Sequence, residues 1–202
     1  HRAGRDRALV RHDLSGRHGA LVRHDLDGSL GGMSVLSREE LRAALLSEPP
    51  LVEGIDPHLQ LQPNGIDLRL ERVQRLTSPG LLGTAEAVRE PAGREEVSAD
   101  ADGWWDLHPG AYVITYAEKV NLPTHLMALG RPRSTLLRSG VAIHGAVWDA
   151  GYCGRGEGLL TVSNARGYRI QRGARVLQLV FFRLGERASE GYRGRYQGEN
   201  VQ

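Results

Sequence analysis

The 202-residue chain is poor in several residue types: it has one cysteine, Cys153, one lysine, Lys119, and 5% aromatic residues. A single thiol forms no internal disulfide, so we expect an intracellular, cytoplasmic setting. No apolar run approaches the roughly 20 residues that a membrane-spanning helix needs, and no signal-peptide pattern opens the chain. The sequence therefore predicts no membrane partner.

Neither sign of charge is in excess, because 26 basic residues face 24 acidic ones and leave a net charge of +2. Since lysine is nearly absent, the positive charge is almost entirely guanidinium. This balance gives no reason to expect a nucleic-acid partner that binds through bulk charge.

The sequence also lacks the usual metal and nucleotide motifs. It has no Cys/His set of the kind that zinc needs and no Walker-type Gly-Lys-Ser/Thr loop. Four of the eight histidines lie in residues 1–32, two of them in His-Asp pairs, and their spacing matches no standard closed site. His125 and His144 have no partner at metal-ligand spacing, so we interpret both as core or turn residues. We predict no metal-ligating side chains.

Residues 1–32 are rich in Arg, His, Asp and Gly and contain a short repeat, in which residues 8–14 recur as residues 20–26. Two copies are too few to build a repeat fold. Met33 follows two glycines and precedes the first organised segment. We predict a disordered extension over residues 1–32 and a folded domain that starts at residue 33.

The first organised segment reads as a short helix. Ser37 and Glu40 form a capping box, and the two prolines at 49–50 end the helix. The Asn64-Gly65 turn signal then precedes a half-buried strand over residues 66–70. Asp67 alternates with the apolar residues of that strand. Its role stays open between a solvent-facing residue, a structural acid and a site acid.

The remainder of the chain indicates β structure. Residues 77–103 show little periodicity and read as a long irregular loop. Short strands with Gly and Pro between them follow, over residues 104–123, 141–148, 159–164, 168–170 and 175–184. The fold class is therefore all-β, a closed barrel or double sheet with one short N-terminal helix.

A cluster of cations and hydroxyls precedes a lone acid. Guanidinium groups beside hydroxyls suit a polyphosphate, because the guanidinium fork matches phosphate oxygens. The cluster consists of Arg131, Arg133, Ser134, Thr135 and Arg138. Asp149 follows about one strand later, where a carboxylate can orient a metal or a water. The alternative is an edge strand with solvated arginines and an ordinary turn aspartate.

Five motifs in order resemble the trimeric dUTPase and dCTP deaminase superfamily. They are Gln62-Pro-Asn-Gly-Ile-Asp-Leu-Arg-Leu70, the His-Pro-Gly segment at 107–114, Arg133-Ser-Thr-Leu-Leu-Arg-Ser-Gly140, residues 146–152 and residues 175–179. The tail at 192–198 resembles the closing segment of the deaminase branch. The resemblance implies a distorted, jelly-roll-like β-barrel over residues 33–190, a flexible C-terminal arm over 191–202, and a homotrimer with active sites between subunits.

The two branches of this superfamily differ in one acidic residue. Its deaminases carry a catalytic glutamate where alignment on Ser163-Asn164 places Thr161, whose hydroxyl cannot serve as that proton shuttle. Glu157 is the nearest acid, and its use would need a shift in register. The diphosphatase pattern is instead matched by Asp149, Tyr152 and Gly154. The chain is thus most similar to dUTP diphosphatase-like members that lack the deaminase glutamate.

The resemblance implies hydrolysis of dUTP to dUMP and diphosphate, with Mg²⁺ held mostly by phosphate oxygens and waters. Asp149 orients the attacking water, and Ser134 and Arg138 complete the catalytic set. The predicted nucleotide contacts are Arg133, Ser134, Thr135, Arg138, Asp149, Tyr152, Gln178, Arg195 and Tyr196. The glycine-rich arm of typical diphosphatases is absent.

Two alternatives stay open at this point. The first is a dCTP deaminase or a bifunctional deaminase-diphosphatase, against which Thr161 argues. The second is a nucleotide-binding regulatory module without turnover, against which the presence of Asp149 with Arg133 and Ser134 argues.

Overall fold

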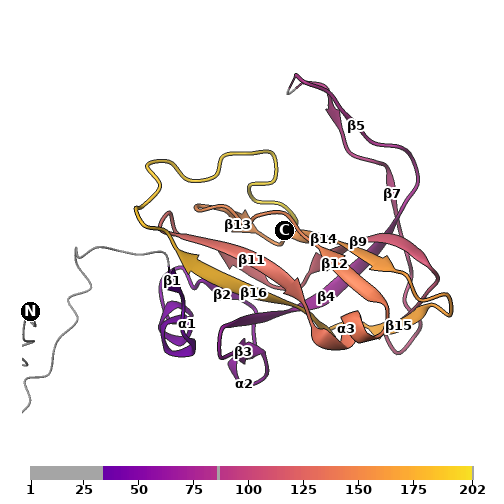
Figure 1. The fold of residues 1–202 in the computed structure, drawn as a ribbon, viewed down its shortest axis with the longest axis horizontal. Coiled ribbons are helices and arrows are strands. Elements are labelled where there is room, and N and C mark those ends of the chain that lie inside the picture. The colour runs from indigo at the N-terminus through magenta and orange to yellow at the C-terminus, as the bar shows by residue number, and fades with distance from the viewer. Residues whose placement is uncertain (1–33, 86, 202) are drawn as a thin grey trace, which may run out of the picture.

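The computed structural model describes residues 34–85 and 87–201, so the repeat and the predicted extension over residues 1–32 lie outside the described residues (Figure 1). Within the described part, no helix is both long and apolar enough to cross a membrane. The architecture is mainly β, which confirms the predicted class.

One large antiparallel sheet forms the body of the molecule, with the order β1-β16-β4-β9-β14-β12 and with β11, β3 and β7 paired beside this path. Its strands are β1 (Ser34–Val35), β3 (Leu61–Gln62), β4 (Gly65–Leu76), β7 (Arg94–Glu96), β9 (Gly110–Tyr116), β11 (Leu126–Pro132), β12 (Val141–His144), β14 (Glu157–Val162) and β16 (Arg175–Arg183).

Three smaller sheets complete the β structure. They pair β2 (Val52–Glu53), β10 (Lys119–Asn121) and β13 (Cys153–Gly154); β8 (Trp104–Leu107) and β15 (Tyr168–Gln171); and β5 (Leu81–Leu82) and β6 (Arg89–Glu90). The stretch 77–103, which the sequence predicts as irregular, thus contains paired strands. Figure 1 shows that β5 and β7 belong to an arm that projects from the body.

Alternating apolar residues along the long strands form the core. Ile66, Leu68 and Leu70 of β4 are fully buried, as the predicted alternation requires. They pack with the buried side chains of β9, β14 and β16 in one cluster. Burial of such side chains on one face of a curved sheet is the main force that stabilises this kind of fold.

The predicted N-terminal helix is present as α1 (Arg38–Ala44). Ser37 Oγ accepts from the Glu40 amide at 3.3 Å, and Glu40 Oε2 accepts from the Ser37 amide at 2.8 Å. This capping box satisfies two amides at the helix start, and the fully buried Leu41 attaches the helix to the core. Two further short helices, α2 (Pro57–Gln60) and α3 (Ser134–Arg138), were not predicted.

A buried polar network joins α2 to the sheet beside the core. Glu118 is fully buried and accepts from Gln60 Nε2 at 2.7 Å, from the Arg69 amide at 2.8 Å and from Arg69 Nε at 2.7 Å. Gln60 Nε2 also donates to the backbone oxygen of Asp67 at 2.8 Å. These bonds tie α2 to β4, the strand that carries Asp67.

Candidate functional site

The predicted phosphate-binding residues lie at α3, the short helix between β11 and β12. Arg133 is its N-cap residue, and Ser134, Thr135 and Arg138 are exposed along it. Leu136 is buried in the core. Because Leu136 points inward, the polar side chains of this short helix are directed to solvent, where a ligand can reach them.

Asp67 of β4 fixes the position of Arg133. Arg133 Nη1 lies 2.7 Å from Asp67 Oδ2, and Arg175 Nη1 lies 3.3 Å from the same oxygen. Asp67 is 2% exposed, so it is a structural acid and not a solvent-facing residue of the strand. Burial raises the pKa of Asp67, and the charges of Arg133 and Arg175 oppose that shift.

Gln178 lies beside this group on β16. Its register partners are Arg131 of β11 on one side and Asp67 of β4 on the other. The Arg133 amide also donates to the backbone oxygen of Val176 at 3.0 Å. Three strands therefore bring Asp67, Arg131 and Gln178, which are distant in sequence, onto adjoining positions.

The predicted water-orienting acid lies in a second group. Asp149, Tyr152 and Tyr196 line one cavity of about 290 Å³, together with Trp148 and Glu199. Asp149 is exposed at this cavity, whereas Tyr152 and Trp148 are buried. In the part of the chain that the structure describes, no hydrogen bond or ion pair reaches the Asp149 carboxylate. Its oxygens are therefore available to a water or a ligand.

Aromatic rings build one wall of this cavity. The Tyr152 ring lies edge-on to Trp148 at 5.2 Å between centroids and 6.0 Å from the ring of Tyr192. Its hydroxyl donates to Glu199 Oε1 at 2.9 Å. Burial, and then the neighbouring Glu199 carboxylate, raise the pKa of Tyr152 above its usual range. Burial also raises the pKa of Glu199. The tyrosine therefore stays a neutral donor.

Tyr192, Tyr196 and Glu199 belong to the C-terminal segment, residues 192–200, which runs along residues 150–155. The Tyr192 amide donates to the Ala150 oxygen at 2.8 Å, and the Gly198 amide donates to the Cys153 oxygen at 2.8 Å. Arg195 lies elsewhere: its Nη1 donates to the backbone oxygen of Arg89 at 3.3 Å. Arg195 therefore contacts the projecting arm and does not line the cavity of Asp149.

The two groups do not meet within one chain. None of the predicted residues at α3 or on β16 lines the cavity of Asp149. Figure 1 shows α3 at the lower edge of the body and the yellow C-terminal segment above β13. A site that uses both groups would need more than one copy of the chain.

Thr161, which the resemblance aligns with the deaminase glutamate, lies on β14 opposite Ala142 of β12. His144 is exposed on β12 and does not lie in the core. Its Nε2 lies 3.4 Å from Thr161 Oγ1. Glu157 stands four residues earlier on the same strand, roughly 13 Å away at the rise of a β-strand. Its carboxylate pairs with Arg94 at 2.5 Å. Glu157 does not take the place of Thr161.

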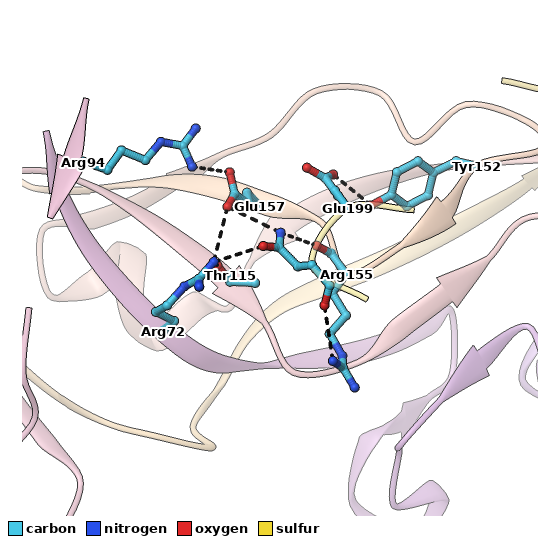
Figure 2. A network of polar contacts seen from close by, with 8 residues as sticks. Arg72, Arg94, Thr115, Tyr152, Arg155, Glu157 and Glu199 are labelled. Atoms are coloured by element: carbon cyan, nitrogen blue, oxygen red, sulfur yellow. Dashed lines mark hydrogen bonds and ion pairs between the residues drawn. The ribbon is translucent and has the colours of Figure 1, made fainter. Parts of the chain in front are cut away.

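The sequence did not reveal several residues that shape this region. Trp148 and Tyr192 complete the cavity wall. Arg72 and Arg94 lie beside Glu157 (Figure 2), and Asn200 Nδ2 approaches the same carboxylate. Trp148 and Tyr192 lie inside the motifs at 146–152 and 192–198, yet only the fold gives them a place in the cavity wall. Arg72, Arg94 and Asn200 belong to no motif of the sequence, and only their meeting in space identifies them. Among residues 34–85 and 87–201, no group of three or more His, Cys, Asp or Glu side chains is arranged to hold a metal.

Comparisons with known proteins agree with the resemblance of the motifs. A dCTP deaminase-like family matches residues 35–184. The chain is 42% identical over 170 residues to a probable deoxyuridine 5′-triphosphate nucleotidohydrolase of Methanococcoides burtonii. This alignment covers 84% of the present chain and 100% of the relative. It is 41% identical over 169 residues to a protein of the same name from Archaeoglobus fulgidus. That alignment covers 84% of the present chain and 99% of the relative.

A solved structure supports the fold. The crystal structure of 2′-deoxycytidine 5′-triphosphate deaminase from Agrobacterium tumefaciens is similar at a TM-score of 0.55 and 22% identity, over 75% of this chain and 48% of that chain. Its likeness concerns the β architecture alone. The family match spans most of the described residues, including α3, Asp149 and Gln178. The chain therefore belongs to the dCTP deaminase-like family, as the order of its motifs predicted.

Proposed function

We propose that this protein is a dUTP diphosphatase, which hydrolyses dUTP to dUMP and diphosphate. The observation that carries the proposal is an exposed carboxylate, Asp149, at an aromatic cavity, with Thr161 at the position of the deaminase glutamate. A carboxylate can orient a water and accept its proton, whereas a threonine hydroxyl stays protonated at neutral pH and cannot accept one. The names of the archaeal relatives agree with this choice.

The reaction needs a positioned water and neutralised phosphates, because phosphoryl transfer depends mainly on placement and electrostatics. Asp149 orients the water and accepts one of its protons as the water oxygen bonds to the α-phosphorus and the bond from that phosphorus to the α,β-bridging oxygen breaks. Arg133 and Arg138 bind phosphate oxygens, and Ser134 donates near the leaving oxygen. Diphosphate leaves with the electron pair of the broken bond.

The remaining predicted contacts have supporting roles. Tyr152 packs beneath the deoxyribose, and its buried ring supports this role. Thr135, Gln178, Arg195 and Tyr196 contact the bound nucleotide. The uracil binds backbone groups of the hairpin at residues 142–148. The limits of the domain at residues 33 and 190 and the cytoplasmic setting stay predictions.

A homotrimer with shared active sites accounts for the separation of the two groups. The α3 residues and Asp149 lie apart on one chain, and no α3 residue lines the cavity of Asp149. If α3 of one subunit faces Asp149 of a neighbour, arginines and carboxylate surround the same triphosphate. Sedimentation or light scattering of the purified protein measures this state, and a monomer that turns over dUTP contradicts it.

Mg²⁺ fits this arrangement as an ion carried by the substrate. The ion would be held mostly by phosphate oxygens and waters, as Mg²⁺ commonly is, so it needs no dedicated carboxylate cage in the protein. The bound ion would supply charge neutralisation at the triphosphate. Removal of divalent ions with EDTA is expected to abolish turnover, and added Mg²⁺ is expected to restore it.

One assay tests the proposal. The protein is incubated with dUTP and, separately, with dCTP in the presence of Mg²⁺, and diphosphate and ammonia are measured. We expect diphosphate from dUTP and no ammonia from dCTP. Ammonia from dCTP would show a deaminase. Binding without any product would show the non-catalytic module.

A further inference from the structure

Glu157 is the centre of a polar network that joins three parts of the chain (Figure 2). It lies on β14 opposite Thr115 of β9, with its side chain 18% exposed. Glu157 Oε2 accepts from Arg94 Nη1 of β7 at 2.5 Å. Glu157 Oε1 lies 3.9 Å from Arg72 Nη2 of β4. One carboxylate thus lies between two guanidinium groups from separate strands.

Asn200, near the chain end, enters this network. Its Oδ1 accepts from Arg72 Nη2 at 3.0 Å, and its Nδ2 donates to the Arg155 oxygen at 3.0 Å and approaches Glu157 Oε1 at 3.4 Å. Its backbone oxygen accepts from Arg155 Nη1 at 3.3 Å. Asn200 has φ +54°, a left-handed conformation that asparagine tolerates better than most residues. Its side chain and backbone are therefore held by groups of the body.

The neighbouring residue connects this anchor to the cavity of Asp149. Glu199 accepts from the Tyr152 hydroxyl, and its backbone oxygen accepts from the Arg155 amide at 3.0 Å. Glu199 and Glu157 both line that cavity. An anchor at Asn200 therefore holds Glu199 and Tyr196 in the cavity wall.

The electrostatics assign the central role to Glu157. Arg72 and Arg94 carry like charges and approach the same carboxylate, so their repulsion is offset only while that carboxylate is ionised. Arg72 in turn holds Asn200. Loss of the Glu157 charge would leave Arg72 beside Arg94 without compensation, and the Arg72 bond to Asn200 would weaken. The charge of Glu157 thus acts on the C-terminal segment through Arg72.

We propose that Glu157 is a positioning residue that latches the C-terminal segment over the cavity of Asp149 and so strengthens nucleotide binding, without taking part in proton transfer. The expected effect on KM rests on the proposed dUTP hydrolysis. The expected release of the C-terminal segment does not depend on any activity. Both oxygens of Glu157 face cationic or amide donors of the latch. The acid nearest to the missing deaminase glutamate is therefore engaged in holding the tail.

The test compares Glu157→Gln with Glu95→Gln. Glu95 also pairs with an arginine of β4, Arg75, but its carboxylate has no hydrogen bond or ion pair with residues 192–200, so it is a matched control. Trypsin cleavage after Arg193 and Arg195 of the full chain is followed by mass spectrometry, because a protease needs a released segment. In Glu157→Gln we expect this cleavage to accelerate at least about fivefold. We also expect KM for dUTP to rise about fivefold while kcat stays within about twofold of the wild-type value.

Asn200→Ala tests the same latch from the tail, where a substitution cannot unfold the sheet. It is expected to reproduce both effects, and the double variant is expected to be no worse than the stronger single variant. Cleavage and KM unchanged from Glu95→Gln in both variants would overturn the inference. So would ammonia release from dCTP that is lost in Glu157→Gln. If the wild-type protein hydrolyses no dUTP, the proposed function fails, while the cleavage rates still decide the latch.

Discussion

Replacing Glu118 with glutamine should destabilise the fold through one identifiable change. Glu118 is fully buried and accepts three hydrogen bonds, one from Gln60 and two from Arg69. Glutamine keeps one acceptor oxygen but directs an NH₂ group at a donor. The Arg69 guanidinium loses its counter-charge, and at least one buried donor loses its acceptor.

The magnitude follows from the burial of the two partners. Removing one partner of a buried ion pair costs about 3–5 kcal/mol. The Arg69 side chain is 36% exposed, so water recovers part of this cost. The unsatisfied donor, at about 1–3 kcal/mol, is part of this cost and is not added to it. We expect the free energy of unfolding to fall by about 3 kcal/mol, which lowers Tm by roughly 6–12 °C in a domain of this size.

Urea unfolding followed by circular dichroism measures this loss, with thermal unfolding as a second probe. Glu95→Gln breaks an exposed ion pair with Arg75 and should change stability by no more than about 0.5 kcal/mol. If Glu118→Gln and Glu95→Gln unfold at the same urea concentration with the same slope, the network does not stabilise the sheet and the reasoning from burial is wrong.

Three further predictions concern activity, packing and pH. Asp149→Asn should lower kcat for dUTP by several orders of magnitude while Kd for a non-hydrolysable analogue changes little; a fully active variant would remove Asp149 from the mechanism. Gly156→Ala places a methyl group against the Trp148 ring and should cost about 1–3 kcal/mol, whereas Gly145→Ala, with open space around it, should cost little in the same urea assay. Burial, aided by Arg183 and Arg187, lowers the pKa of His125 below 6.5, so the folded state disfavours its protonation. The free energy of unfolding should therefore fall as pH drops below 6.5. In His125→Gln it should fall less between about pH 7.5 and 5.5, and an unchanged dependence on pH would exclude His125 as the cause.

Local signals in the sequence predicted several features correctly. Ser37 and Glu40 lie three residues apart, so the capping box needs no information from elsewhere in the chain. The alternation at Ile66, Leu68 and Leu70 likewise reports one buried strand face. The motif order around α3 and Asp149 identified the family. Each of these features depends on residues close in sequence, whose geometry the backbone itself imposes.

Tertiary structure alone decided the partners of the charged residues. Asp67 lies in a strand alternation that suits a solvent-facing residue, yet it is buried because Arg133 and Arg175 arrive from distant segments. Glu157 is near the deaminase position in sequence, but β4 and β7 bring Arg72 and Arg94 to it, and Asn200 closes the group from the chain end. A charge takes its role from what surrounds it in space. Local sequence shows which residues carry charge, and only the pairing of strands determines which charges meet.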